Sequence, residues 1–374
     1  MLRDSLSPAE KAFLDIAGKQ NSDPYQVQNE WWPTIMSLAL QHKMSSLVSD
    51  NLGHHVPQPW SRKLKKATAA QALWSARQTH CWKLIREKIR ASGLEVVVLK
   101  GLRSRQDLYR APHHRFLSDH DLLIHLEDLD YWERELRALG FQAHSPTDLK
   151  TGYHTAFYSP LGVVELHWGF GGGLPATQGW EASVPWECEN IRGLSAEDRL
   201  LFQLHHAVRH EFGMSMYQYL DIARLLETDW CEDKLVERAQ IWSRPKAYQL
   251  VSEIAHQLFC LPHSRLPDLH DNRAPDGVAK AAVRIAISGA AQAGTVKRLR
   301  SRKALPSPWV DERTLRRHFK LTPEQEVTAW HQIKYSKSRL SSFITDLKFK
   351  AGHAKVVKNE RMVLDWLKHE APPK

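Results

Sequence analysis

Strand-like segments occur in one part of this chain, and their place limits the folds open to it. Three of them are LEVVVLK at residues 94–100, DHDLLIH at 119–125 and GVVELHW at 162–168. Each is short and rich in β-branched or aliphatic residues, as buried strands are. On both sides of this part, apolar residues recur every three or four positions, which is the period of an amphipathic helix. The pattern therefore predicts an α/β unit between two helical regions.

Local signals place the boundaries of these regions. A long helical pattern ends at Gly93, where glycine can take the left-handed conformation that ends helices. YHTAFYS and GVVELHW are joined by PLG, which predicts a hairpin. From Ser195 the pattern is helical again and opens with a Ser-x-x-Asp cap. We therefore expect an N-terminal helical region over residues 1–92, an α/β core over 93–190 and a C-terminal helical region over 191–374.

Basic residues are concentrated towards the C-terminus. The net charge is +10, and residues 291–374 hold 19 lysines and arginines against 8 aspartates and glutamates. Such a segment suits RNA, DNA, an anionic membrane surface or an acidic partner. The alternative is a solvated helical surface with surplus lysines.

Several protein classes are excluded by composition. Hydrophobic residues make up 42% of the chain, enough for globular cores. The four cysteines are far apart and lack the spacing of a zinc site, so we expect ordinary buried thiols in a reducing cytoplasm. The first residues carry charges throughout, and the most apolar later stretch is interrupted by Arg284. We expect a soluble, cytoplasmic protein without a membrane span.

Two acidic residues open the second strand-like run. Asp119 and Asp121 are two positions apart, so in a strand their side chains project from the same face. Carboxylates this close repel unless a cation lies between them. Mg²⁺ prefers such oxygen ligands together with substrate phosphates. Glu165, embedded among apolar residues of another run, is the candidate third carboxylate. Taken alone, an Asp-x-Asp pair is more often solvated or caps a helix.

A phosphate site is the expected neighbour of these carboxylates. Lys100 and Gly101 form the turn between a strand and a helix, where backbone N–H groups can bind a phosphate and Lys100 adds positive charge. Arg115, four residues before Asp119, is within reach of a nucleotide phosphate. The alternative for Arg115 is an ordinary surface arginine in a loop.

In this order, the segments VVVLKGLRSRQDLY, RFLSDHDLLI, ALGF, VVELHW, HHAVRH and YLDIARLL resemble a known family. It is the uncharacterised nucleotidyltransferase family, within the DNA polymerase β-like nucleotidyltransferase superfamily. The resemblance extends from about Trp31 to Leu226. It implies an α/β (α+β) fold in which a mixed sheet is flanked by helices. Lys100 and Gly101 match the family's LKG, whereas Leu102 stands where the wider superfamily usually has a serine.

The resemblance also implies an activity. Asp119, Asp121 and Glu165 would bind two Mg²⁺ ions that position a nucleoside triphosphate, with ATP as the expected one. An acceptor hydroxyl would then attack the α-phosphate in line and release pyrophosphate. His120 departs from the aliphatic residue usual between the two aspartates, so either the opposite face of the strand is more polar here or His120 is exposed.

Further polar residues lie in the segments that resemble the family. His167 shares a strand face with Glu165, so it is a candidate base, acceptor contact or support for the metal ligands. We favour a packed, hydrogen-bonded histidine. His206, His210 and Asp221 are interpreted as a polar cluster that docks the C-terminal helices against the site. His154 either lines the pocket or is a surface residue of its strand.

Three functions are compatible with these features. The first is Mg²⁺-dependent nucleotidyl transfer to a small molecule or sugar, a protein side chain or an RNA end. The second is a catalytically inactive module with the same fold that binds RNA or a protein. The third is a phosphate-ester hydrolase that uses the same carboxylates. Because all three carboxylates, Lys100 and Gly101 are present, we favour the first.

Overall fold

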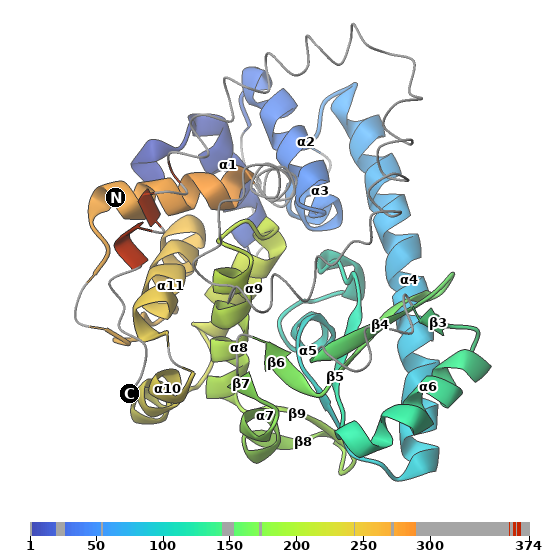
Figure 1. Ribbon diagram of the computed structural model, residues 1–374. Coiled ribbons are helices and arrows are strands. Elements are labelled where there is room, and N and C mark those ends of the chain that lie inside the picture. The colour runs from blue at the N-terminus through green and yellow to red at the C-terminus, as the bar shows by residue number, and fades with distance from the viewer. Residues whose placement is uncertain are drawn as a thin grey trace, which may run out of the picture.

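Figure 1 shows the computed structural model, which describes residues 2–19, 27–53, 55–143, 153–171, 174–242, 244–270 and 273–288, together with 359, 362–363 and 365–367. Most of the basic segment 291–374 lies outside these residues, so its predicted polyanion contact does too. No helix in the described part of the chain combines the length and the apolar character needed to cross a bilayer.

A seven-stranded sheet confirms the predicted fold class. Its strand order is β3-β4-β5-β2-β1-β9-β8. Strands β1 and β9 are parallel, as are β2 and β5, whereas the other neighbours are antiparallel, so the sheet is mixed. The strands are β1 (Val96–Val98), β2 (His120–Leu123), β3 (Gln142–Ala143), β4 (His154–Ser159), β5 (Gly162–His167), β8 (Ser183–Cys188) and β9 (Ile191–Leu194). A separate small hairpin joins β6 (Gly169–Gly171) to β7 (Leu174–Pro175).

The hairpin predicted around PLG is present. Strands β4 and β5 pair antiparallel from His154 opposite His167 to Ser159 opposite Gly162. Strand β9, by contrast, begins at residue 191, just beyond the predicted end of the α/β core, and pairs with both β1 and β8. The sheet therefore extends past residue 190, and the division of the chain into three regions stays a prediction.

Capping residues mark the start of the first helix before the sheet and the end of the last one. Ser7 and Glu10 form the capping box of α1, because each side chain accepts a hydrogen bond from the other residue's backbone N–H. Gly93, with a φ of 71°, ends α4 in the left-handed conformation, as predicted. These helices are α1 (Pro8–Gly18), α2 (Trp32–Gln41), α3 (Ser45–Leu52) and α4 (Trp60–Ser92).

Two hydrophobic cores lie on the two faces of the centre of the sheet. One contains residues of both the N-terminal helices and the helices that follow the sheet, among them Leu14 and Leu250. The other contains Trp82 of α4, Trp132 of α6 and Leu122 of β2. In Figure 1, α4 runs as one long helix past both the N-terminal helices and the sheet. Helices later in the chain include α5 (Gly101–Asp107), α6 (Leu129–Ala138), α7 (Thr177–Glu181), α8 (Ala196–Arg209), α9 (Met216–Leu225), α10 (Glu232–Ile241) and α11 (Pro245–Phe259).

Candidate active site

The parallel pairing of β2 with β5 brings two of the predicted carboxylates together. Asp121 and Glu165 are directly opposed in the register of this pair, so their side chains leave the same face of the sheet. His167 lies two residues after Glu165 and therefore on that face as well. Ligand atoms of Asp121, Glu165 and His167 all lie within 4.8 Å of one another. The structure therefore brings Asp121, Glu165 and His167 together on one face of the sheet, and Asp119 is not part of this group of ligand atoms.

Asp119, the third predicted carboxylate, lies immediately before β2. Its Oδ1 accepts a hydrogen bond of 2.9 Å from the Ser118 hydroxyl. Burial, together with the negative charges of Asp121 and Glu165, raises the pKa of Asp119 to about 6, and the nearby Lys100 offsets only part of this. The raised pKa means that the ionised form of the Asp119 carboxyl is less stable in the folded protein than in water.

Lys100, which the sequence predicts to add positive charge for a phosphate, lies against one of the carboxylates. Its Nζ lies 2.6 Å from Oδ1 of Asp121, and the side chain of Asp121 is 1% exposed. Burial acts to lower the pKa of Lys100, but Asp121, Asp119 and Glu165 outweigh it and raise this pKa above its ordinary value. Lys100 is therefore charged and is held by Asp121, at the junction between β1 and α5.

His167 is a second partner of the same carboxylates. Its Nε2 lies 3.1 Å from Oδ1 of Asp121 and 3.3 Å from Oε2 of Glu165. Burial acts to lower the pKa of His167, yet these two hydrogen bonds raise it above its ordinary value. Despite burial, Lys100 and His167 keep the pKa of Asp121 below its usual range. This arrangement fits the packed, hydrogen-bonded histidine that we favoured.

Arg115 is placed differently from the phosphate contact that the sequence suggested. Its Nε and Nη2 donate to Oδ2 of Asp221 at 3.0 and 2.7 Å, and both side chains are buried. The Asp221 carboxylate also accepts a hydrogen bond of 2.8 Å from the Tyr109 hydroxyl. The guanidinium is thus directed into an ion pair that fastens α9 to the segment before Asp119.

Position 101 requires glycine because the side chain of Arg115 lies against its backbone. A Cβ atom added at Gly101 would come within 2.6 Å of Nη1 of Arg115 and 2.8 Å of Cδ1 of Leu117. Only glycine leaves room for this approach. The Lys100-Gly101 turn, the Arg115–Asp221 pair and the start of α5 are therefore packed as one unit beside the carboxylates.

The remaining predicted histidines lie around the site in two places. The ring of His154 stacks on that of His167, with centroids 5.1 Å apart, so His154 extends the polar face rather than lying alone on the surface of β4. Burial lowers the pKa of His154 to about 4, and the charge of His167 adds to this.

The rings of His206 and His210 are 4.3 Å apart, and His206 Nε2 lies 3.0 Å from Gln218 Nε2 of α9. The polar cluster predicted on α8 and α9 is thus divided, since Asp221 contacts Arg115 and Tyr109 instead.

His120 projects to the opposite face of the sheet. It is fully buried and stacks on Trp82 of α4, with ring centroids 6.3 Å apart. Burial lowers the pKa of His120 to about 3. His120 is thus a buried polar residue beside a hydrophobic core, and the alternative of an exposed His120 is wrong.

Two residues that the sequence did not predict lie beside His154 and His167, on the face of the sheet that carries the carboxylates. Arg209 of α8 donates to the Phe170 carbonyl at 3.0 Å, hydrogen-bonds the Tyr153 hydroxyl and lies over the Tyr153 ring. Arg209 stands within the HHAVRH segment that carries the family resemblance, between the predicted site residues His206 and His210. Tyr153, which precedes His154, had no signal of its own.

A comparison with protein families decides the classification. The model of the family described as "Uncharacterised nucleotidyltransferase" matches residues 28–260. The chain belongs to this family. The match confirms the predicted resemblance and supports a nucleotidyltransferase that uses a nucleoside triphosphate. Enzymes of this type generally use divalent metal ions, and the group of Asp121, Glu165 and His167 offers suitable ligand atoms. Neither a curated protein nor a solved structure matches the chain.

Proposed function

We propose that this nucleotidyltransferase moves an NMP unit from a nucleoside triphosphate, with ATP as the expected donor, to an acceptor hydroxyl and releases pyrophosphate. The observation that supports this most is that Asp121 and Glu165 lie opposite each other on neighbouring strands, with Asp119 immediately before β2 and Lys100 against Asp121. Paired carboxylates next to a lysine are what a site needs in order to bind both metal ions and phosphates.

The carboxylates fit Mg²⁺ by their chemistry and charge. All three offer hard oxygen ligands, which Mg²⁺ prefers. Lys100 and His167 balance Asp121, whereas burial and then the charges of Asp121 and Glu165 still raise the pKa of Asp119. We infer that Asp119, Asp121 and Glu165 hold two Mg²⁺ ions. When bound, Mg²⁺ would supply positive charge that stabilises the phosphate oxygens during transfer.

The carboxylates, Lys100 and His167 have different roles in the proposed reaction. The three carboxylates bind and orient the donor's cations. Lys100 donates to a phosphate when its bond to Asp121 is released, since its ammonium is buried beside the site and carries charge. His167 orients Asp121 and Glu165 through its hydrogen bonds, and its raised pKa suits a donor to these carboxylates more than a base.

Transfer of label from the α-phosphate tests this function. The full chain is incubated with Mg²⁺, each α-³²P-labelled NTP in turn, and RNA, protein or small-molecule acceptors, and labelled products are separated by gel or thin-layer chromatography. We expect Glu165→Gln to reduce transfer by more than about 100-fold, since it removes charge stabilisation from the reacting phosphate. Glu95→Gln is the matched control, because Glu95 is an exposed acid before β1.

The other two functions give different results in the same experiment. A catalytically inactive module would bind RNA or a protein with a steep dependence on salt, and Glu165→Gln would leave that binding unchanged. A hydrolase would release a labelled product from a phosphate ester without any acceptor. If no NTP binds in the presence of Mg²⁺, nucleotidyl transfer is ruled out.

A further inference from the structure

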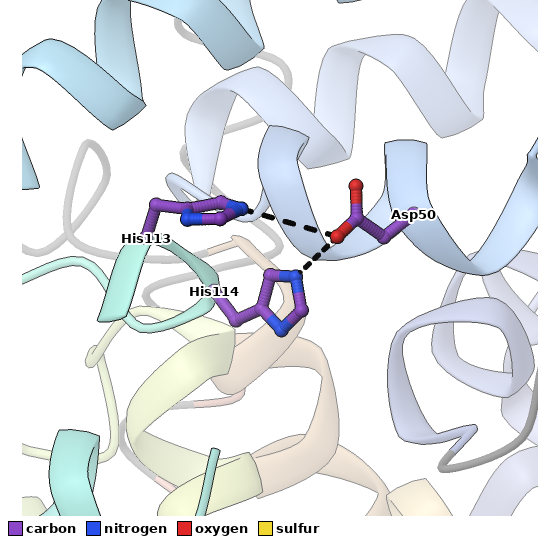
Figure 2. A group of neighbouring side chains, drawn as sticks. All are labelled: Asp50, His113 and His114. Carbon is purple, nitrogen blue, oxygen red and sulfur yellow. Dashed lines mark hydrogen bonds and ion pairs between the residues drawn. The ribbon is translucent and has the colours of Figure 1, made fainter. Parts of the chain in front are cut away.

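A second group of metal-binding side chains lies away from the carboxylates of the sheet. Asp50 of α3 meets His113 and His114 of the short 3₁₀ helix η3 (Pro112–His114), and the three ligand atoms lie within 4.8 Å of one another. Figure 2 shows both imidazole rings turning a nitrogen towards the same oxygen of Asp50. His114 Nε2 lies 2.5 Å from this oxygen and His113 Nε2 lies 3.9 Å from it.

Hydrogen bonding accounts for only part of this geometry. The contact of His114 with Asp50 is a hydrogen bond, but the 3.9 Å separation of His113 Nε2 from Asp50 Oδ2 is too long for one. Ligand atoms held about 2.0–2.1 Å from a tetrahedral zinc ion lie about 3.3 Å from one another. The two observed separations lie on either side of this value. Small movements of Asp50 and His113 would therefore place all three atoms at ligand distance.

The surroundings allow these movements while keeping the site in place. The side chains of Asp50 and His113 are 49% and 35% exposed, so both can adjust, whereas His114 is 9% exposed and fixed by packing. The backbone of η3 is held by Gln71 of α4, whose Nε2 donates to the His113 carbonyl at 3.0 Å. One anchored ligand with two adjustable ones is a partly preformed metal site.

We propose that Asp50, His113 and His114 bind Zn²⁺, with water at the remaining position. Two imidazole nitrogens and one carboxylate oxygen suit Zn²⁺ or a similar transition metal, whereas Mg²⁺ prefers oxygen ligands alone. The ion joins α3 of the N-terminal helices to η3, which leads directly into Arg115. It therefore braces the segment that carries Arg115 and Asp119, and this role does not depend on the proposed nucleotidyl transfer.

Zinc titration of the full chain tests the site. Metal-free protein is titrated with ZnCl₂ against a chromogenic zinc indicator, and melting is followed by differential scanning fluorimetry. The chain carries Glu165→Gln throughout, because the group of Asp121, Glu165 and His167 is a second place where zinc could bind. We expect His113→Ala to weaken the tightest zinc binding at least about tenfold and to abolish the rise in Tm that zinc causes.

The controls separate this site from other zinc binding. His113 is half-buried, so His113→Ala should fold, and His80→Ala removes an exposed histidine of α4 that lies outside the group. His80→Ala should bind zinc as the parent does, and MgCl₂ should not raise Tm through this site. X-ray absorption of the zinc-loaded protein should show nitrogen and oxygen ligands without sulfur. Equal zinc affinity in His113→Ala and the parent, or a sulfur ligand, would overturn the proposal.

Discussion

The ammonium of Lys100 lies 2.6 Å from Oδ1 of Asp121, one of the three carboxylates proposed to bind Mg²⁺. The protein therefore carries its own cation at the place where an ion is expected to act. A lysine in this position allows the carboxylates to stay close together in the metal-free protein, because it balances part of their repulsion. The same position lets Lys100 and a divalent ion compete for Asp121.

This competition predicts the behaviour of Lys100→Met. Without Lys100, the buried Asp121 loses its closest positive charge, so the metal-free variant should be less stable by about 3 kcal/mol. Mg²⁺ should then raise the Tm of the variant more than that of the parent, since the ion replaces the lost charge. Melting curves with EDTA and with MgCl₂ measure both effects. Lys88→Met, which removes a more exposed pair with Glu135, should show no added response to Mg²⁺.

Asp119→Asn should stabilise the metal-free protein at neutral pH. The folded pKa of about 6 lies above the ordinary value of 3.8, so the parent loses stability as the pH rises through about 6, and asparagine avoids this loss. The advantage of the variant should therefore be largest above about pH 6 and shrink in more acidic solution. Mg²⁺ should stabilise the parent more than the variant. Calorimetry at several pH values tests this, and an advantage that grows towards acid pH would contradict it.

The Arg115–Asp221 pair should matter for stability more than an exposed pair does. Asp221→Ala leaves the buried guanidinium of Arg115 without its carboxylate, which should cost about 3–5 kcal/mol of unfolding free energy. Glu133→Ala removes the exposed pair with Arg137 and should cost less than about 1 kcal/mol. Urea denaturation measures both variants. Similar small losses in the two would show that the buried pair does not fasten α9 to the site.

His120→Val should be at least as stable as the parent. Within the described structure, neither ring nitrogen of His120 has a hydrogen-bond partner, and its pKa is lowered to about 3 by burial. Below about pH 6.5 the unfolded chain gains a proton at this residue while the folded protein does not. The parent should therefore lose stability relative to the variant as the pH falls, by at most about 1.4 kcal/mol per pH unit. Urea denaturation of both proteins at several pH values measures this. A difference in unfolding free energy that is the same at pH 5 and pH 8 would contradict it.

Local patterns in the sequence were enough to predict the strands that carry the carboxylates. Alternation along β2 and β5 placed Asp121 and Glu165 on defined faces, and the parallel register then brought them opposite each other. Strands β8 and β9 were missed because Pro185 and Gly193 interrupt runs that are already short. Arg115 was assigned to a phosphate because its partner, Asp221, is 106 residues away along the chain. No local pattern specifies a contact between residues so far apart.

The 33 residues of α4 form one continuous helix about 50 Å long, and its residues contribute to both hydrophobic cores. Leu64 near one end packs with the N-terminal helices, and Ile85 near the other packs beneath the strands. A fragment that starts after α4 would expose to water the face of the β-sheet that α4 covers. Trimming the protein to a minimal enzyme should therefore fail unless the trimmed form keeps this helix and the helical layer against which its other end rests.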